Sequence, residues 1–174
     1  PSRVTPGEFG GPVDPFSPPW QPGQLLSIGT GGSLTVRFAN PIRDNPAHPY
    51  GLDFLVFGSA GFMITNGDFT GGGITDGSLF GASEAITHVS VSSDGLNFFG
   101  LDRLAVPRLD SLFPTDGSGD FTRPVNPALQ ASDFNGLDLA GIRVAYDGSG
   151  GGAGYDIAWA RTTAGRPAFL TEIQ

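Results

Sequence analysis

The chain has 174 residues, 39% of them hydrophobic, and a formal net charge of −8. This length and apolar content suffice for one domain with its own core. The acidic balance argues against nucleic acid as a partner, and the absence of cysteine excludes disulfides, thiol catalysis and Cys-based zinc sites.

The composition favours β-structure. The chain carries 28 Gly and 15 Pro but one Met and no Lys, so helix-forming residues are scarce and turn-forming residues are abundant. No stretch approaches the roughly eighteen apolar residues that cross a bilayer, so we expect no membrane insertion. The start at Pro1, without a charged-then-apolar leader, is expected of a mature or excised segment.

The first 23 residues are rich in Pro and Gly and show neither helical nor strand periodicity. They predict an irregular N-terminal arm over 1–23. This arm is either a flexible linker or a segment that packs on the domain through Phe9, Phe16 and Trp20. Residues 24–174 are expected to form a single domain.

From Gln24 onward, short apolar or alternating segments are bounded by Gly, Pro, Asn or Asp, which is typical of strands. The predicted strands are Leu25–Ile28, Ser33–Phe38, Leu52–Phe57, Ala85–Ser92, Asn97–Leu101, Gly141–Tyr146, Tyr155–Ala160 and Ala168–Ile173. Eight short strands predict an all-β fold, a two-sheet antiparallel β-sandwich of jelly-roll-like form with long loops.

The turns between these strands are indicated by residue type. Asp94-Gly95 between two strands predicts a hairpin, because Asp-Gly supplies the positive φ angles of a tight turn. Gly31-Gly32 would turn the chain in the same way. The stretches 58–83 and 102–139 are long loops, and 127–139 has room for one helical turn.

The residue types needed for catalysis are few. The two histidines are His48, in a proline-ordered loop, and His88, in an alternating strand, and both fit surface or turn positions. No Gly-x-Ser-x-Gly elbow occurs, and the glycine run over 148–154 lacks the Lys-Ser/Thr pair of a phosphate-binding loop. We therefore expect no enzyme activity.

Calcium takes about six to eight oxygen ligands, often from loops. Asn66-Gly67-Asp68 resembles a fragment of a calcium loop but lacks the EF-hand spacing, and the same residues suit a turn. Asn66 and Asp68 are therefore candidate calcium ligands, with turn formation as the competing explanation.

Asn45-Pro-Ala-His-Pro-Tyr-Gly-Leu-Asp-Phe-Leu-Val-Phe-Gly58 resembles a Pro-Tyr-Gly-x-Asp-Phe-x-Val-x-Gly-Asn strand of secreted bacterial cell-surface domains, a poorly characterised family. Similar segments follow in the family's order: Gly29–Phe38, Ser83-Glu84 leading into Val89–Gly95, and Gly154–Ala160. The resemblance implies a jelly-roll-like sandwich, secretion, and a place in surface or matrix proteins beside adhesion modules. It names no ligand. Ser59 replaces the family's Asn, and Ala85 its Pro.

Three of the four family-like segments hold an acid in or directly beside a predicted strand: Asp53, Glu84 and Asp156. Asp is depleted in strands, and a buried carboxylate is unfavourable unless it is paired or bound to a cation. Three explanations remain open: an arginine such as Arg143 or Arg161 neutralises these acids, they share a calcium ion, or they are exposed to solvent.

Three function classes remain open. The first is a non-catalytic extracellular module that binds carbohydrate or matrix material, with Trp20, Tyr50, Tyr155 and Trp159 as candidate ligand-binding aromatics that could equally be core. The second is a structural subunit of a bacterial surface layer, filament or adhesive matrix, joined to neighbouring protein subunits by strand addition. The third is a polysaccharide-active enzyme.

Overall fold

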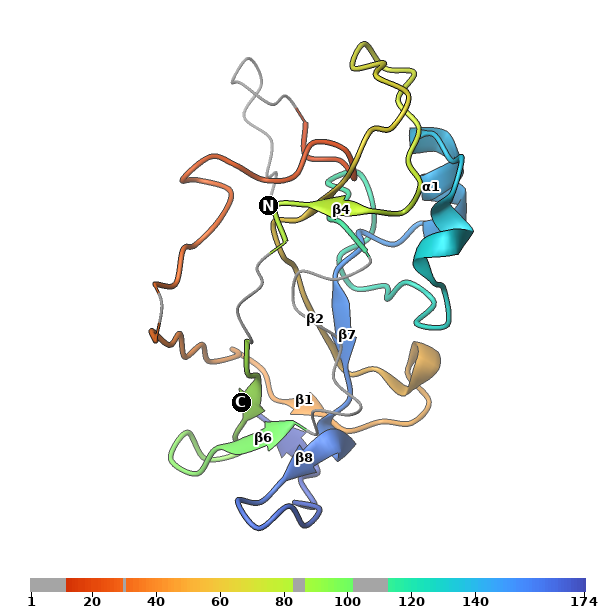
Figure 1. Cartoon of the computed structure of the whole chain (residues 1–174). Helices are drawn as coiled ribbons and strands as arrows, with labels where there is room; N and C mark the ends of the chain where they lie inside the picture. The colour runs from red at the N-terminus through yellow and green to blue at the C-terminus, as the bar shows by residue number, and fades with distance from the viewer. Residues whose placement is uncertain (1–11, 30, 83–86, 102–112) are drawn as a thin grey trace.

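The computed structural model describes residues 12–29, 31–82, 87–101 and 113–174. Over these residues the chain forms one α-helix and short strands paired antiparallel in four small sheets, with no closed barrel (Figure 1). The first three sheets pair β1 (Ile42–Arg43) with β9 (Glu172–Ile173), β2 (Phe54–Val56) with β7 (Ala153–Tyr155), and β3 (Gly61–Phe62) with β4 (Leu79–Phe80). The fourth has the order β5 (Ser90–Val91), β6 (Phe99–Leu101), β8 (Ala160–Arg161).

The β-rich class is therefore as expected, while the strand pairing over the described residues does not confirm a two-sheet sandwich. Short 3-10 helices stand between the strands: η1 (Pro49–Gly51), η2 (Ala131–Phe134) and η3 (Ile157–Trp159). η2 lies where the sequence allowed a helical turn, and the Asp133 carboxylate accepts the Gln130 N–H at its start.

The prediction of a strand over Gly141–Tyr146 is wrong, because this segment belongs to helix α1 (Leu139–Tyr146). Ile142 and Tyr146 are four residues apart and both buried, whereas Val144 between them is exposed, which is the pattern of one helix face. Asp138 starts the helix by accepting the Gly141 N–H at 2.8 Å.

The predicted Asp94-Gly95 hairpin is confirmed. β5 and β6 pair with Val91 opposite Phe99, and Gly95 has a φ of 71°. One Asp94 carboxylate oxygen accepts the N–H groups of Leu96 and Asn97 at 2.8 and 2.7 Å. Hydrogen bonds from Asn97 and Leu96 lower the Asp94 pKa well below its ordinary value.

The predicted strands Leu25–Ile28 and Ser33–Phe38 are not formed as ladder strands in this structure. The turn between them is present, since Gly32 N–H donates to Gly29 O at 2.8 Å. The predicted strand Tyr155–Ala160 is interrupted by η3, because the Asp156 side chain caps a helical turn there. Strands β1, β3 and β4 were not predicted.

The buried apolar residues form two clusters. The sheet core consists of Val91, Leu101, Ala153, Tyr155, Ile157, Ala160, Ala168 and Ile173. The helix core, where α1 and η2 meet β3, consists of Phe62, Val125, Phe134, Ile142 and Tyr146. The Phe62 and Phe134 rings lie 4.8 Å apart, a favourable aromatic separation.

The described part of the N-terminal arm packs on the domain instead of forming a free linker. Val13 is buried, and its carbonyl accepts the Gly117 N–H at 2.8 Å. The Pro15 carbonyl accepts the N–H of Phe62 in β3 at 2.7 Å. Phe16 packs against the helix core, whereas Phe9 lies outside the described residues.

An ion pair between a buried carboxylate and a half-exposed arginine joins α1 to the segment before η2. The side chain of Asp116 is 2% exposed and accepts from Arg143 Nε at 2.7 Å and from Ser118 Oγ at 2.7 Å. Burial opposes ionisation of Asp116, but the hydrogen bonds from Arg143 and Ser118 outweigh it and lower the pKa.

The glycine run over 148–154 is tightly packed, not the flexible loop that its composition suggests. Residues 149–153 are buried, and Gly150 exchanges hydrogen bonds with Asp116 and Asp120. A Cβ atom at the facing Gly119 would lie 2.2 Å from the Ser149 carbonyl oxygen. The two backbones approach this closely only because side chains are absent.

Candidate metal centre

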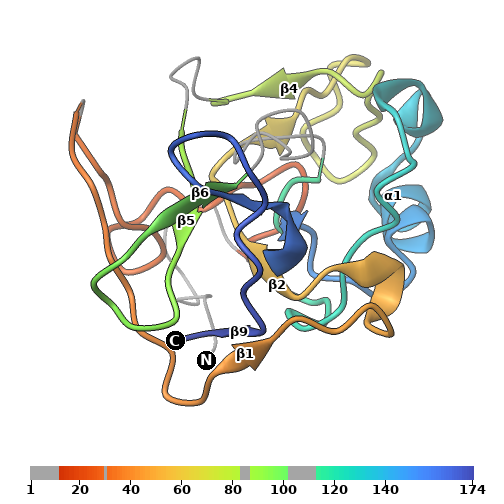
Figure 2. The same ribbon diagram turned by 90° about the horizontal axis from the view of Figure 1, so that it is seen from below.

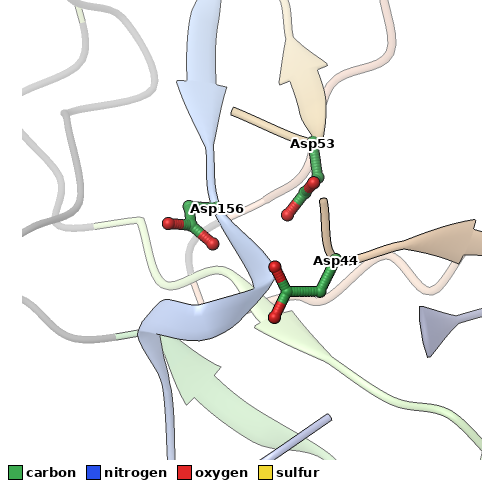
Figure 3. A group of neighbouring side chains, drawn as sticks. All are labelled: Asp44, Asp53 and Asp156. Carbon is green, nitrogen blue, oxygen red and sulfur yellow. The ribbon is translucent and has the colours of Figure 1, made fainter. Parts of the chain in front are cut away.

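Three carboxylates, those of Asp44, Asp53 and Asp156, come together, as Figure 3 shows. Each offers an oxygen, and these oxygens all lie within 4.8 Å of one another. Calcium–oxygen distances reach about 2.6 Å, so two ligands of one ion lie no more than about 5.2 Å apart. The three oxygens are therefore close enough to share one cation.

The register of β2 and β7 places two of these acids. Phe54 lies opposite Tyr155, and the Asp53 N–H donates to the Tyr155 carbonyl at 2.8 Å. Asp53 precedes β2 and Asp156 follows β7, so the same antiparallel register sets the two acids opposite each other. They occupy one end of this two-stranded sheet (Figure 3).

Asp44 comes from a different sheet. It follows β1, and its N–H donates to the Thr171 carbonyl at 3.1 Å, beside the β1–β9 pair. The eight residues 45–52 then lead from Asp44 to Asp53. Tyr50 and Gly51 have φ angles of 58° and 69°, which turn the chain back within η1.

The side chain of Asp53 is completely buried and well supplied with donors. Its Oδ1 accepts from Asn45 N at 3.0 Å and from His48 Nδ1 at 2.9 Å, and its Oδ2 accepts from Ile157 N at 2.9 Å. Since each carboxylate oxygen has two lone pairs, Oδ2 retains one acceptor position. These donors fix the carboxylate in the way that outer-shell groups orient metal ligands.

The Asp156 carboxylate has fewer hydrogen-bond donors than the Asp53 carboxylate. Its Oδ1 accepts the Ala158 N–H at 2.7 Å at the start of η3. Burial raises the Asp156 pKa most, the Ala158 N–H opposes that rise, and the nearby charges of Asp53 and Asp44 add to it. The carboxylate is thus destabilised in its ionised form, a situation that a bound cation would reverse.

The two arginines proposed as partners of the strand acids form other contacts. Arg143 pairs with Asp116, and Arg161 donates to the carbonyl oxygens of Ala158 and Ala160. Asp53 does have a partner, but it is His48. Neither His48 nor Asp44 was among the predicted site residues, although His48 lies in the family-like segment that begins at Asn45 and Asp44 immediately precedes that segment.

The remaining predicted metal ligands do not join this group. Glu84 lies outside the described residues. Asn66 and Asp68 lie in the β3–β4 loop, which Figure 1 shows at the opposite end of the molecule from β1. Their oxygens accept N–H groups of the loop itself, and hydrogen bonds from Thr70 lower the pKa of Asp68. This is turn chemistry.

The four candidate ligand-binding aromatics divide into two exposed and two packed side chains. Trp20 is 54% exposed and stacks on Phe80, and Tyr50 is 56% exposed. Tyr155 is fully buried and stacks on Phe54, and Trp159 packs against the sheet core. A buried ring cannot form a platform for an external ligand, so Tyr155 serves the core. Tyr50 is exposed, and in the sequence it lies between Asp44 and Asp53.

Comparison with protein-family models, with curated proteins and with solved structures found no match. Among the described residues, no helix has the length and hydropathy required to span a membrane.

Proposed function

We propose that this chain is a non-catalytic, extracellular binding module whose ligand surface is organised by a calcium ion held by Asp44, Asp53 and Asp156. The observation that carries this proposal is the convergence of three carboxylates whose oxygens lie within 4.8 Å of one another. Carboxylate oxygens are hard ligands, and calcium prefers them to nitrogen or sulfur ligands.

The charge balance of the site supports a cation. Of the three acids, Asp53 is hydrogen-bonded to His48, while the raised pKa of Asp156 reflects burial and repulsion from the other two. A divalent ion would offset that repulsion. Backbone carbonyls and water would complete the coordination of about six to eight oxygens.

The calcium ion would also organise a surface loop. Asp44 and Asp53 stand at the two ends of residues 45–52, and this loop carries the exposed Tyr50. We propose carbohydrate or matrix material as the ligand, because an exposed aromatic ring on this loop can pack on a sugar ring while calcium-bound carboxylates accept hydrogen bonds from its hydroxyl groups. Secretion, a jelly-roll-like two-sheet arrangement and a cell-surface location are proposed from the family resemblance alone.

A hydrolase is the second candidate. A half-exposed His48 whose Nδ1 bonds a buried Asp53 has the arrangement of a general base and its orienting acid. Within the described residues, no hydroxyl is hydrogen-bonded to the other ring nitrogen of His48. The binding module is therefore preferred, since the base lacks a nucleophile there.

Calcium titration by calorimetry, followed by a glycan array in calcium and in EDTA, tests the proposal. We expect one calcium per chain and glycan binding that requires calcium and falls at least about tenfold in Tyr50→Ala, about 1.4 kcal/mol. Phe169→Ala, which removes another exposed aromatic ring, is the matched control. Absence of calcium binding would refute the site, and hydrolysis of a glycan would favour the second candidate.

A further inference from the structure

A separate feature lies at the edge of the molecule, in the segment 24–38. Its two legs, Leu25–Ile28 and Ser33–Phe38, project from the body in the views of Figures 1 and 2, joined by the turn at Gly29–Gly32. Within the described part of the chain, neither leg takes part in a backbone ladder. Among the described residues, the backbone donors and acceptors of this β-type sequence therefore have no ladder partner, which is the situation that favours strand addition.

Each leg carries two apolar side chains that are exposed. Leu34 and Val36, which alternate along the second leg, are 53% and 60% exposed, and Leu26 and Ile28 on the first leg are 67% and 49% exposed. Four neighbouring exposed apolar side chains are unusual on an isolated soluble surface and are typical of contact surfaces.

The second leg leaves the body at a fixed point. Phe38 packs against the sheet core, and Arg37 Nη2 donates to the Gln174 side chain at 3.1 Å. Gln174 in turn donates to the Ser93 carbonyl at 2.6 Å, beside the β5–β6 hairpin. A strand held at its base loses less conformational freedom when it pairs, so it is a favourable surface for strand addition.

The charge distribution indicates a second copy of this chain as the partner. The chain carries a net charge of −8, so two copies repel each other over most of their surfaces. Between Asp14 and Asp44, however, the sequence contains no acid at all. The exposed apolar legs lie inside this acid-free stretch, so their own side chains bring no negative charge to a contact between copies.

We propose that Ser33–Phe38 pairs antiparallel with the same segment of a second copy. Pairing about Thr35 would set Leu34 of each copy opposite Val36 of the other and Arg37 opposite Ser33. This register brings apolar side chains together and sets no like charges directly opposite each other. The contact is independent of the acid site, and it would make the chain a self-assembling surface module.

Sedimentation equilibrium in EDTA tests this proposal without involving calcium. We expect a concentration-dependent dimer whose Kd rises at least about tenfold in Val36→Glu and in Thr35→Pro. Thr35→Pro removes one backbone donor from the ladder. Val144→Glu is the matched control, because it places the same charge at a 79%-exposed apolar site on α1 and should leave the dimer intact.

Either of two results would overturn the proposal: a wild-type chain that stays monomeric to about 1 mM, or a dimer equally sensitive to Val36→Glu and Val144→Glu. A monomeric chain that binds a free extended peptide at this segment would assign the surface to a different partner.

Cysteine cross-linking gives an independent readout. The chain has no cysteine, so the single variants are Leu34→Cys, Thr35→Cys and Val36→Cys. At least one should cross-link between copies faster than Val144→Cys, and equal rates would count against the pairing.

Discussion

Asp53 and Asp156 lie directly opposite each other, one residue beyond the paired ends of β2 and β7. Like charges in this relationship destabilise an antiparallel pair. Asp53 is supported by His48 and two backbone N–H groups, whereas Asp156 accepts one backbone N–H and has a raised pKa. A cation bound as proposed would offset this repulsion and would thereby couple local stability to its presence.

Calcium should raise the melting temperature of the chain, and EDTA should lower it. Calcium at 100 times its Kd would stabilise the folded state by about 2.7 kcal/mol, and each kcal/mol shifts the melting temperature by about 2–4 °C at this chain length. Differential scanning calorimetry at several calcium concentrations measures the shift. A melting temperature unaffected by calcium would refute the acid site.

Asp156→Asn should change stability in opposite directions with and without calcium. In EDTA it removes a repelled charge and is expected to stabilise the fold slightly, by about 0.5–1 kcal/mol, and in calcium it should abolish the metal-dependent gain. Asp76→Asn is the control, since that exposed carboxylate bonds Ser78 outside the acid site. Loss of stability in EDTA on Asp156→Asn would contradict the repulsion.

His48→Ala should destabilise the chain because it removes a donor from the fully buried Asp53 carboxylate. Leaving a buried charged acceptor undersupplied typically costs about 1–3 kcal/mol, which urea denaturation can measure. His88→Ala, which changes the other histidine at an exposed position, is the control and should destabilise the chain less than His48→Ala does. Equal effects of the two variants would show that the His48 contact contributes nothing specific.

Arg143→Met should destabilise the chain by about 1–3 kcal/mol, because Asp116 remains buried without its charged partner. Arg123→Met is the matched control, since Arg123 pairs with Asp147 at the exposed surface and should contribute less than about 1 kcal/mol. Chemical denaturation of both variants at neutral pH gives the comparison. A smaller effect for Arg143→Met than for Arg123→Met would contradict the role of Arg143 as the charged partner of the buried Asp116 carboxylate.

The same ion pair predicts a pH dependence. The Asp116 pKa is lowered in the folded chain relative to its ordinary value of 3.8. Its contribution is therefore fully present above pH 3.8 and is lost as the pH falls through the lower, folded-state pKa. Acid titration of Asp116→Asn should show a weaker stability loss in this window than the wild type shows.

Gly119→Ala should destabilise the chain strongly for a one-carbon change. The added Cβ would lie 2.2 Å from the Ser149 carbonyl oxygen, so one backbone must move, and overpacking of this kind costs about 1–3 kcal/mol. Gly23→Ala, where nothing lies within 4 Å of the added atom, is the control. Thermal melts of the two variants should separate clearly, and equal melting temperatures would contradict the close packing.

The sequence predicted features that depend on a few adjacent residues. The Asp94-Gly95 turn is confirmed, because its carboxylate and positive φ act locally. Asp53 and Asp156 were predicted as metal ligands because acids are unusual in apolar segments, and the structure brings these two side chains together. Local chemistry of this kind can be recognised without knowledge of the strand pairing.

The sequence misled where helical and strand periodicity fit the same residues, and it missed a site residue whose position depends on a strand partner far away in the chain. The apolar positions 142, 144 and 146 alternate like a strand, yet the Asp138 cap and the buried 142/146 pair select a helix. Asp44 reaches the site through the pairing of β1 with β9, which are far apart in sequence. No local pattern around Asp44 specifies that pairing.

The three acids connect two separate sheets, and two of them, Asp44 and Asp53, stand at the ends of one loop. Asp44 extends the β1–β9 pair, while Asp53 and Asp156 extend the β2–β7 pair. An ion bound among them would make the two pairs open together, since opening of either would release it. Hydrogen exchange at these amides should thus merge into a single unit with calcium and separate into two without it.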